Sequence, residues 1–182
     1  IAFAEASGIP ELRRTTRDEP DYMKLMNWRM GILKEHGLGI REIQDVISRI
    51  DPLPGAKEFM DELRKLTQVV ILSDTFEEFA MPLMKKLNYP SLFCNSLDID
   101  KDGFLCGVKM RCDHSKLTTV RALQSCGFET IASGDSYNDL EMIQASKAGF
   151  LFRTTDKIKA DYPGIPAFES FDDLLTAIKA AL

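Results

Sequence analysis

Two polar clusters follow apolar runs in this sequence, and both have residue types that bind phosphate or metal ions. The first cluster, Ser73-Asp74-Thr75, follows the run Val69–Leu72. A continuous apolar run indicates a strand buried on both faces, so we expect Ser73 at its carboxyl end. Residues Thr75-Phe76-Glu77-Glu78 match a capping box, and a helix starting there would point its free N–H groups at Ser73 and cradle a phosphate. An ordinary strand-to-helix turn, in which Ser73 only caps, is the alternative.

The second cluster is Gly134-Asp135-Ser136-Tyr137-Asn138-Asp139, which follows the expected strand Thr130–Ala132. Asp135 would lie beyond the carboxyl end of that strand, where open α/β sheets bind ligands. Asp135 and Asp139 are four residues apart, and two carboxylates there suit Mg²⁺, which prefers oxygen ligands. The alternative is that Asp135 and Asn138 only shape a turn, which would leave Asp139 without a partner.

Lys116 follows Asp113-His114-Ser115, a sequence that indicates the start of a helix. A cation in the first turn of a helix opposes the helix dipole and costs a few tenths of a kcal/mol. An anion close to Lys116 would reverse that cost. An exposed, solvated lysine is the competing interpretation.

Arg29 lies within the helix expected over Asp21–Glu35. It shares a helical face with an apolar stripe made of Tyr22, Leu25, Met26, Ile32 and Leu33. An arginine on a buried face needs an acceptor, and its planar fork suits a carboxylate or a phosphate. A side chain that extends to solvent is equally compatible with the sequence.

Two further groups of residues resemble metal sites only superficially. Cys106, Cys112 and His114 lack the fourth ligand and the spacing of a zinc site. The stretch Asp98–Gly103 begins like a calcium loop, but Lys109 stands where that loop needs a bidentate glutamate. We expect this stretch to be the acidic turn of a hairpin over Ser96–Met110, since Cys94–Leu97 is too polar and too short for a buried strand.

The composition excludes several classes of protein. The chain has 182 residues, of which 45% are hydrophobic, and a net charge of -5, so a nucleic-acid or anionic-membrane partner is not expected. No apolar run is long enough for a membrane span, and the first residues have no signal pattern. Its four cysteines form no Cys-x-x-Cys pair, which favours reduced thiols and a cytoplasmic location.

The elements expected from periodicity divide the chain into two domains. Residues 1–53 are helix-rich, beginning with a helix over Ile1–Ser7, and form a helical cap subdomain. Residues 54–182 alternate between helices and strands, which predicts an α/β fold with a doubly wound parallel sheet. The elements expected there are helices Ala56–Leu66, Phe76–Leu87 and Ser170–Leu182 and strands Val69–Leu72, Thr130–Ala132 and Gly149–Phe152.

Taken in order, Ser73, Lys116 and Gly134–Asp139 resemble the haloacid dehalogenase-type phosphatases, and the whole chain resembles the phosphoserine phosphatase branch. The stretches Thr15–Tyr22 and Val70–Phe76 are closer still to the bifunctional phosphoserine phosphatase/homoserine phosphotransferase subgroup. Its marker is Ser73-Asp74-Thr75, where ordinary phosphoserine phosphatases have Ser-Gly-Gly.

The resemblance implies a role for each candidate residue. Ser73 would hold the phosphoryl group, Lys116 would neutralise its charge, and Asp135 would coordinate Mg²⁺. Asp139, in the second shell, and Asn138 would complete the metal and phosphate surroundings. Substrate-binding roles fall to Arg29, which would hold a substrate carboxylate, and to Tyr22 and Asp74.

The same resemblance implies an enzyme that takes the phosphoryl group of O-phosphoserine through an aspartyl-phosphate and passes it to water or to homoserine. The attacking aspartate of this family lies on a first strand that would precede Ile1, so we expect a longer natural protein. Losing that strand, the middle of the family's sheet, would split the core. A phosphatase for another small phosphomonoester and a non-catalytic phosphate- or metal-binding domain are the alternatives. A homodimer is left open.

Overall fold

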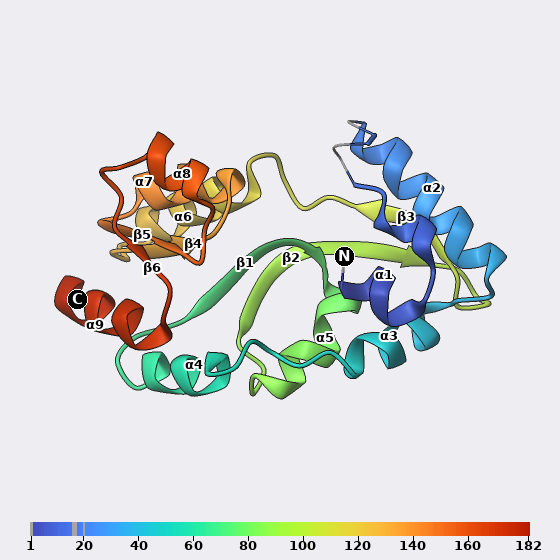
Figure 1. Ribbon diagram of the computed structural model, residues 1–182, viewed down its shortest axis with the longest axis horizontal. Coiled ribbons are helices and arrows are strands. Elements are labelled where there is room, and N and C mark those ends of the chain that lie inside the picture. The colour runs from blue at the N-terminus through green and yellow to red at the C-terminus, as the bar shows by residue number, and fades with distance from the viewer. Residues whose placement is uncertain (1, 16–17, 20) are drawn as a thin grey trace. The chain divides into compact units, whose positions relative to one another are not determined.

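A computed structural model describes residues 2–15, 18–19 and 21–182 (Figure 1). Expectations that involve Ile1, Thr16, Arg17 or Pro20 lie outside these residues. In chain order the described elements are α1 (Ala2–Ser7), the 3₁₀ helix η1 (Pro10–Arg13), α2 (Tyr22–Glu35), α3 (Ile40–Ser48), α4 (Ala56–Arg64), β1 (Val70–Phe76), α5 (Glu77–Lys86), β2 (Ser91–Ile99), β3 (Leu105–Lys109), α6 (Ser115–Ser125), β4 (Ile131–Gly134), the 3₁₀ helix η2 (Tyr137–Asp139), α7 (Leu140–Ala145), β5 (Ala148–Phe152), α8 (Asp156–Asp161), β6 (Ala167–Phe168) and α9 (Phe171–Ala181).

The chain forms two compact units. The first contains the residues up to Leu53 together with Ser73–Arg111, and the second contains Pro54–Leu72 and Cys112–Leu182. The expected domain boundary after residue 53 coincides with one crossing between the units. The expected core over 54–182 is divided, however, because residues 73–111 pack with the N-terminal helices, where α3 contacts α5 and α2 contacts β3.

The α/β fold class is as expected, but the strands form two three-stranded sheets, ordered β1-β2-β3 and β4-β5-β6. In the second unit β4, β5 and β6 are parallel, with Ile131 opposite Ala148 and Leu151 opposite Ala167. Helices separate these strands along the chain, and Leu151 is fully buried between them. Among the described helices none is long and apolar enough to cross a membrane.

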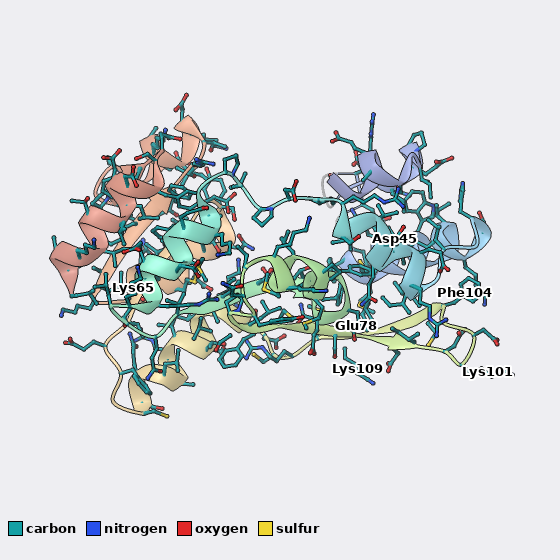
Figure 2. All side chains as sticks on the ribbon, turned by 90° about the horizontal axis from the view of Figure 1, so that it is seen from below. Asp45, Lys65, Glu78, Lys101, Phe104 and Lys109 are labelled. Atoms are coloured by element: carbon teal, nitrogen blue, oxygen red, sulfur yellow. The ribbon has the colours of Figure 1, made fainter. Side chains whose placement is uncertain are left out.

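In the first unit β2 and β3 form the expected hairpin, with Ser96 opposite Lys109. Its turn is fixed by the Asp100 carboxylate, which accepts the N–H groups of Asp102 and Phe104. Figure 2 shows Lys101 at this turn and Lys109 on β3. Strand β2 begins earlier than expected, at Ser91, so Cys94–Leu97 lies within a strand that is only partly buried. Its polar Asn95 is buried with hydrogen-bond partners for its amide.

The expected helix over Asp21–Glu35 is confirmed as α2, with the Asp21 side chain capping its start by accepting the Lys24 N–H. Its apolar face is buried in a cluster that also contains Phe76 of β1. The buried residues of α2 are Leu25, Met26, Met30 and Leu33.

The predicted capping box at Thr75–Glu78 is wrong. Strand β1 continues through Thr75 to Phe76, and helix α5 starts at Glu77 with no side-chain cap. Phe76 is only 4% exposed, and burying an aromatic ring in the first unit outweighs a local capping preference. Ser73 therefore lies within a strand, where its hydroxyl accepts the Thr75 N–H at 3.2 Å.

Candidate functional site

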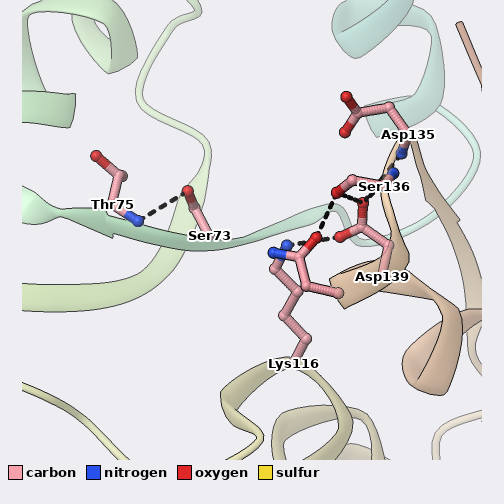
Figure 3. Close-up of polar contacts among 7 residues, drawn as sticks. Ser73, Thr75, Lys116, Asp135, Ser136 and Asp139 are labelled. Carbon is pink, nitrogen blue, oxygen red and sulfur yellow. Dashed lines mark hydrogen bonds and ion pairs between the residues drawn. The ribbon is translucent and has the colours of Figure 1, made fainter. Parts of the chain in front are cut away.

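The second unit contains a nearly buried ion pair between Lys116 and Asp139 (Figure 3). The Lys116 Nζ lies 2.6 Å from Asp139 Oδ1, and the two side chains are 12% and 5% exposed. Lys116 is the second residue of α6, where a positive charge is unfavourable unless an anion lies nearby, and Asp139 is such an anion. The alternative of an exposed, solvated Lys116 is wrong.

Asp139 also braces the backbone that follows β4. Its Oδ2 accepts the N–H groups of Asp135 and Ser136, and the Ser136 hydroxyl, each at 3.0 Å. Burial alone would raise the pKa of Asp139, but Lys116 and the Ser136 hydrogen bonds outweigh burial and hold the pKa below its ordinary value. Asp139 is therefore a carboxylate anion that fixes the turn after β4.

Gly134 makes this arrangement sterically feasible. A Cβ at position 134 would lie 2.4 Å from both Cβ and Cγ of Asp139, far closer than atoms can approach. Only glycine lets the Asp139 side chain lie against the strand end.

The Asp135 carboxylate is exposed at the carboxyl end of β4, and its backbone is held on both sides. Asp139 accepts its N–H, and the Thr154 hydroxyl donates to its carbonyl oxygen at 2.6 Å. Thr154 was not among the residues predicted from the sequence. Its place just after β5 is the available signal, because the carboxyl ends of neighbouring parallel strands meet at one edge.

Among the residues that the structure describes, no three of the types His, Cys, Asp and Glu gather closely enough to hold a metal ion. Both oxygens of Asp139 accept hydrogen bonds, so of the two aspartates Asp135 has the carboxylate available to bind a metal ion. This donor set fits Mg²⁺, which often takes one or two carboxylates and completes its shell with water and substrate phosphate. The neighbouring Asn138 has its side-chain oxygen engaged by the Ser136 hydroxyl.

In the first unit Arg29 is half-buried on α2. Its Nη2 donates to the Arg14 carbonyl at 2.6 Å, while its Nε is buried and has no hydrogen-bond partner among the described residues. Burial lowers the pKa of Arg29, and the nearby Tyr22 partly offsets that effect. The Arg14 guanidinium lies 5.1 Å from the centre of the Trp28 ring, a stack that accompanies this contact. The Nε of Arg29 is therefore an unsatisfied buried donor within the described structure.

Tyr22 connects the remaining candidates of the first unit electrostatically. Burial raises the pKa of Tyr22, the Arg29 charge lowers it and the Asp74 charge raises it. Ser73 and Asp74 lie on β1 in the same unit. The helix N-terminus expected beside Ser73 is absent, because α5 begins four residues later at Glu77.

The structure therefore groups the candidate residues into two sets. Lys116, Asp135, Asn138 and Asp139 belong to the second unit, and Tyr22, Arg29, Ser73 and Asp74 belong to the first. The roles implied for them by resemblance remain predictions. The ion pair of Lys116 with Asp139 is a contact between two of the predicted residues.

The second unit places a charged site at the carboxyl end of a parallel strand, which is where open α/β proteins bind their ligands. The model of the haloacid dehalogenase-like hydrolases matches residues 14–147, and the chain belongs to this family.

Similar proteins include the phosphoserine phosphatase ThrH of Pseudomonas aeruginosa, which is 47% identical over 96% of this chain and 85% of its own length. A phosphoserine phosphatase of Pseudomonas syringae pv. tomato is 48% identical over 96% of this chain and 73% of its own length. A solved phosphoserine phosphatase, an analogue of its phospho-aspartyl intermediate, has a TM-score of 0.73 at 22% identity and covers 97% of this chain and 89% of its own. That structural likeness concerns the fold.

Proposed function

We propose that this protein is a Mg²⁺-dependent phosphatase of O-phosphoserine, with homoserine as a second acceptor of the phosphoryl group. The names of the similar enzymes support the substrate, and Ser73-Asp74-Thr75 supports the homoserine branch through its resemblance to the bifunctional subgroup. All four cysteines are free, which agrees with a reducing, cytoplasmic setting.

The observation that carries the proposal is the unsatisfied Nε of Arg29. Leaving a buried donor without a partner costs about 1–3 kcal/mol, so an unsatisfied donor calls for an explanation, and a bound ligand supplies one. A guanidinium fork binds a carboxylate through two parallel hydrogen bonds. Arg29 already uses Nη2 for the Arg14 carbonyl, which orients the fork and leaves Nε for the α-carboxylate of an amino-acid substrate.

The groups of the second unit fit the phosphoryl chemistry. Asp135 is the exposed carboxylate for Mg²⁺, which when bound would polarise the phosphoryl oxygens. Lys116 supplies a fixed positive charge whose position is set by Asp139, so little reorganisation is needed as negative charge develops. By resemblance to the family, the phosphoryl group passes through an aspartyl-phosphate.

Phosphorus NMR of the protein with Mg²⁺, phosphoserine and homoserine tests the reaction. Growth of free phosphate supports the phosphatase, and a new phosphohomoserine signal supports the transferase. Absence of both signals, with phosphoserine bound in calorimetry, would instead support a non-catalytic binding domain.

The role of Arg29 is tested by replacing it with alanine and comparing phosphoserine with phosphoethanolamine, which lacks the carboxylate. We expect Arg29→Ala to weaken phosphoserine binding about tenfold or more, the loss of one charge-assisted contact, and to leave phosphoethanolamine unchanged. The exposed Arg13→Ala is the matched control. Equal losses for both ligands would favour a phosphatase of another small phosphomonoester.

A further inference from the structure

Asp74 lies on β1, the strand whose Phe76 joins the hydrophobic cluster of α2. Side chains alternate along a strand, so Asp74 shares a face with Phe76. Phe76 is buried in a cluster with Met26 and Met30 of α2, and Tyr22 packs against the same cluster. Phe76 is buried and Asp74 is exposed, so this face of β1 carries an exposed carboxylate two residues before the aromatic ring that packs into the cluster of α2.

Asn95 fixes the backbone that presents Asp74. Its side chain is only 3% exposed, and its Nδ2 donates to the Asp74 carbonyl at 3.1 Å. Its Oδ1 accepts the Arg111 N–H at 3.0 Å. A buried amide with both ends satisfied holds one geometry, so Asn95 is a positioning residue for Asp74.

Tyr22 lies within electrostatic reach of both Arg29 and Asp74, which act on its phenol in opposite directions. The opposite charges of Arg29 and Asp74 therefore both act on one aromatic residue of α2. A free amino acid carries the complementary pair of charges, an ammonium and a carboxylate on a single carbon atom. Two opposite charges at one site discriminate such a ligand from esters that have only one of these groups.

We infer that Asp74 is a specificity-determining residue that binds the α-ammonium group of the substrate, while Arg29 binds its α-carboxylate. This inference rests on the proposed function and adds to it the recognition of the amino group. It also explains why an acidic residue lies at the centre of Ser73-Asp74-Thr75, and why the buried Asn95 fixes the backbone of that residue.

The test is calorimetric binding, in the presence of Mg²⁺, of the phosphonate analogue of phosphoserine, in which a methylene group replaces the ester oxygen. This ligand cannot be hydrolysed, so the measurement needs no turnover. A second ligand is the same phosphonate without the amino group. The variants are Asp74→Asn, which keeps the shape and removes the charge, and Asp102→Asn, the same change at the exposed hairpin turn.

We expect Asp74→Asn to weaken binding of the complete phosphonate about tenfold and to leave the ligand without an amino group unchanged. Asp102→Asn should alter neither. An equal loss for both ligands, or no loss for either, overturns the role of Asp74 while wild-type binding still supports the proposed function. If the wild-type protein binds neither phosphonate, the proposed function falls and the inference falls with it. Unchanged melting temperatures show that the variants are folded.

Discussion

Lys116 and Asp139 are opposite charges that have lost most of their contact with water. Removing charges from water is costly, and the cost is recovered only when good geometry and further hydrogen bonds satisfy both groups. Asp139 meets this condition, since it also accepts the N–H groups of Asp135 and Ser136. The pair therefore connects the start of α6 to the turn after β4.

Replacing Lys116 with methionine should lower the free energy of unfolding by about 3 kcal/mol, because Asp139 is left as a buried, unpaired charge. The matched control is Lys147→Met. Lys147 pairs with Glu129, but those side chains are 44% and 76% exposed, so the control should lose less than about 1 kcal/mol. Urea unfolding monitored by circular dichroism measures both. Similar losses of unfolding free energy in the two variants would show that the buried Lys116 pair stabilises the protein no more than the exposed pair does.

The pH dependence of this difference follows from the lowered pKa of Asp139. A depressed pKa contributes stability above the unfolded-state value near 3.8, and that stability is lost as the pH falls through the lower folded-state value. Replacing Lys116 also removes the main cause that holds this pKa down, so the pKa of Asp139 is higher in the variant than in wild type. The difference between wild type and Lys116→Met should therefore be largest at neutral pH and shrink as the pH falls, because the unpaired Asp139 is protonated first in the variant.

His114 occupies the N-cap position of α6, and its Nδ1 donates a hydrogen bond of 2.9 Å to the Glu141 carboxylate. This hydrogen bond and the negative charge of Glu141 raise the pKa of His114. A raised pKa contributes stability that is complete below the ordinary value near 6.5 and disappears as the pH rises through the folded-state value.

Glu141→Gln should therefore lower the melting temperature relative to wild type at about pH 5.5, and the difference should shrink at about pH 8.5. The effect is small because both side chains are exposed. Glu58→Gln, an exposed change on α4, is the control and should give no such trend. A difference that grows with pH would contradict the assignment.

At the scale of elements, β4 packs closely against η2 because Gly134 has no side chain. Gly134→Ala should destabilise the protein by about 1–3 kcal/mol, because its Cβ would displace Asp139 from the strand end. Gly164→Ala is the control, since no atom lies within 4 Å of its Cβ. Urea unfolding compares the two. A Gly134→Ala protein as stable as its control would show that Asp139 can move at little cost.

The elements also show what the sequence can and cannot predict. Helix α2 was predictable because its Asp21 cap and its apolar stripe agree, and the hairpin was predictable from its turn residues. The start of α5 was not, because burial of Phe76 in the tertiary core overrides the local capping pattern.

The same distinction applies to the site. Lys116 signalled a nearby anion through its unfavourable place in a helix, and Asp139 is that anion. Asn95 gave no such signal, and Thr154 gave only its place after β5, because each bonds to a backbone carbonyl that only the tertiary structure brings within reach.

At the scale of the molecule, each hydrophobic cluster of the described residues lies within one of the two units. One cluster contains residues of the first unit, among them Ile43 and Phe76. The other two, which include Leu151 and Leu174, contain residues of the second. Local stability follows local burial of apolar contacts, so a cavity in one cluster should act mainly on its own unit.

Ile43→Ala and Leu151→Ala test this, because both side chains are fully buried and each change should cost about 2–5 kcal/mol in lost contacts and cavity formation. Hydrogen exchange followed by mass spectrometry resolves where protection is lost. We expect Ile43→Ala to raise exchange in α2, α3 and β2, and Leu151→Ala to raise it in β4 and β5. The chain crosses between the units after Leu53, Leu72 and Arg111, so these three crossings are the covalent route by which one change could reach the other unit. If either variant accelerates exchange equally in both units, the protein unfolds as a single cooperative structure, and its two cores stabilise each other.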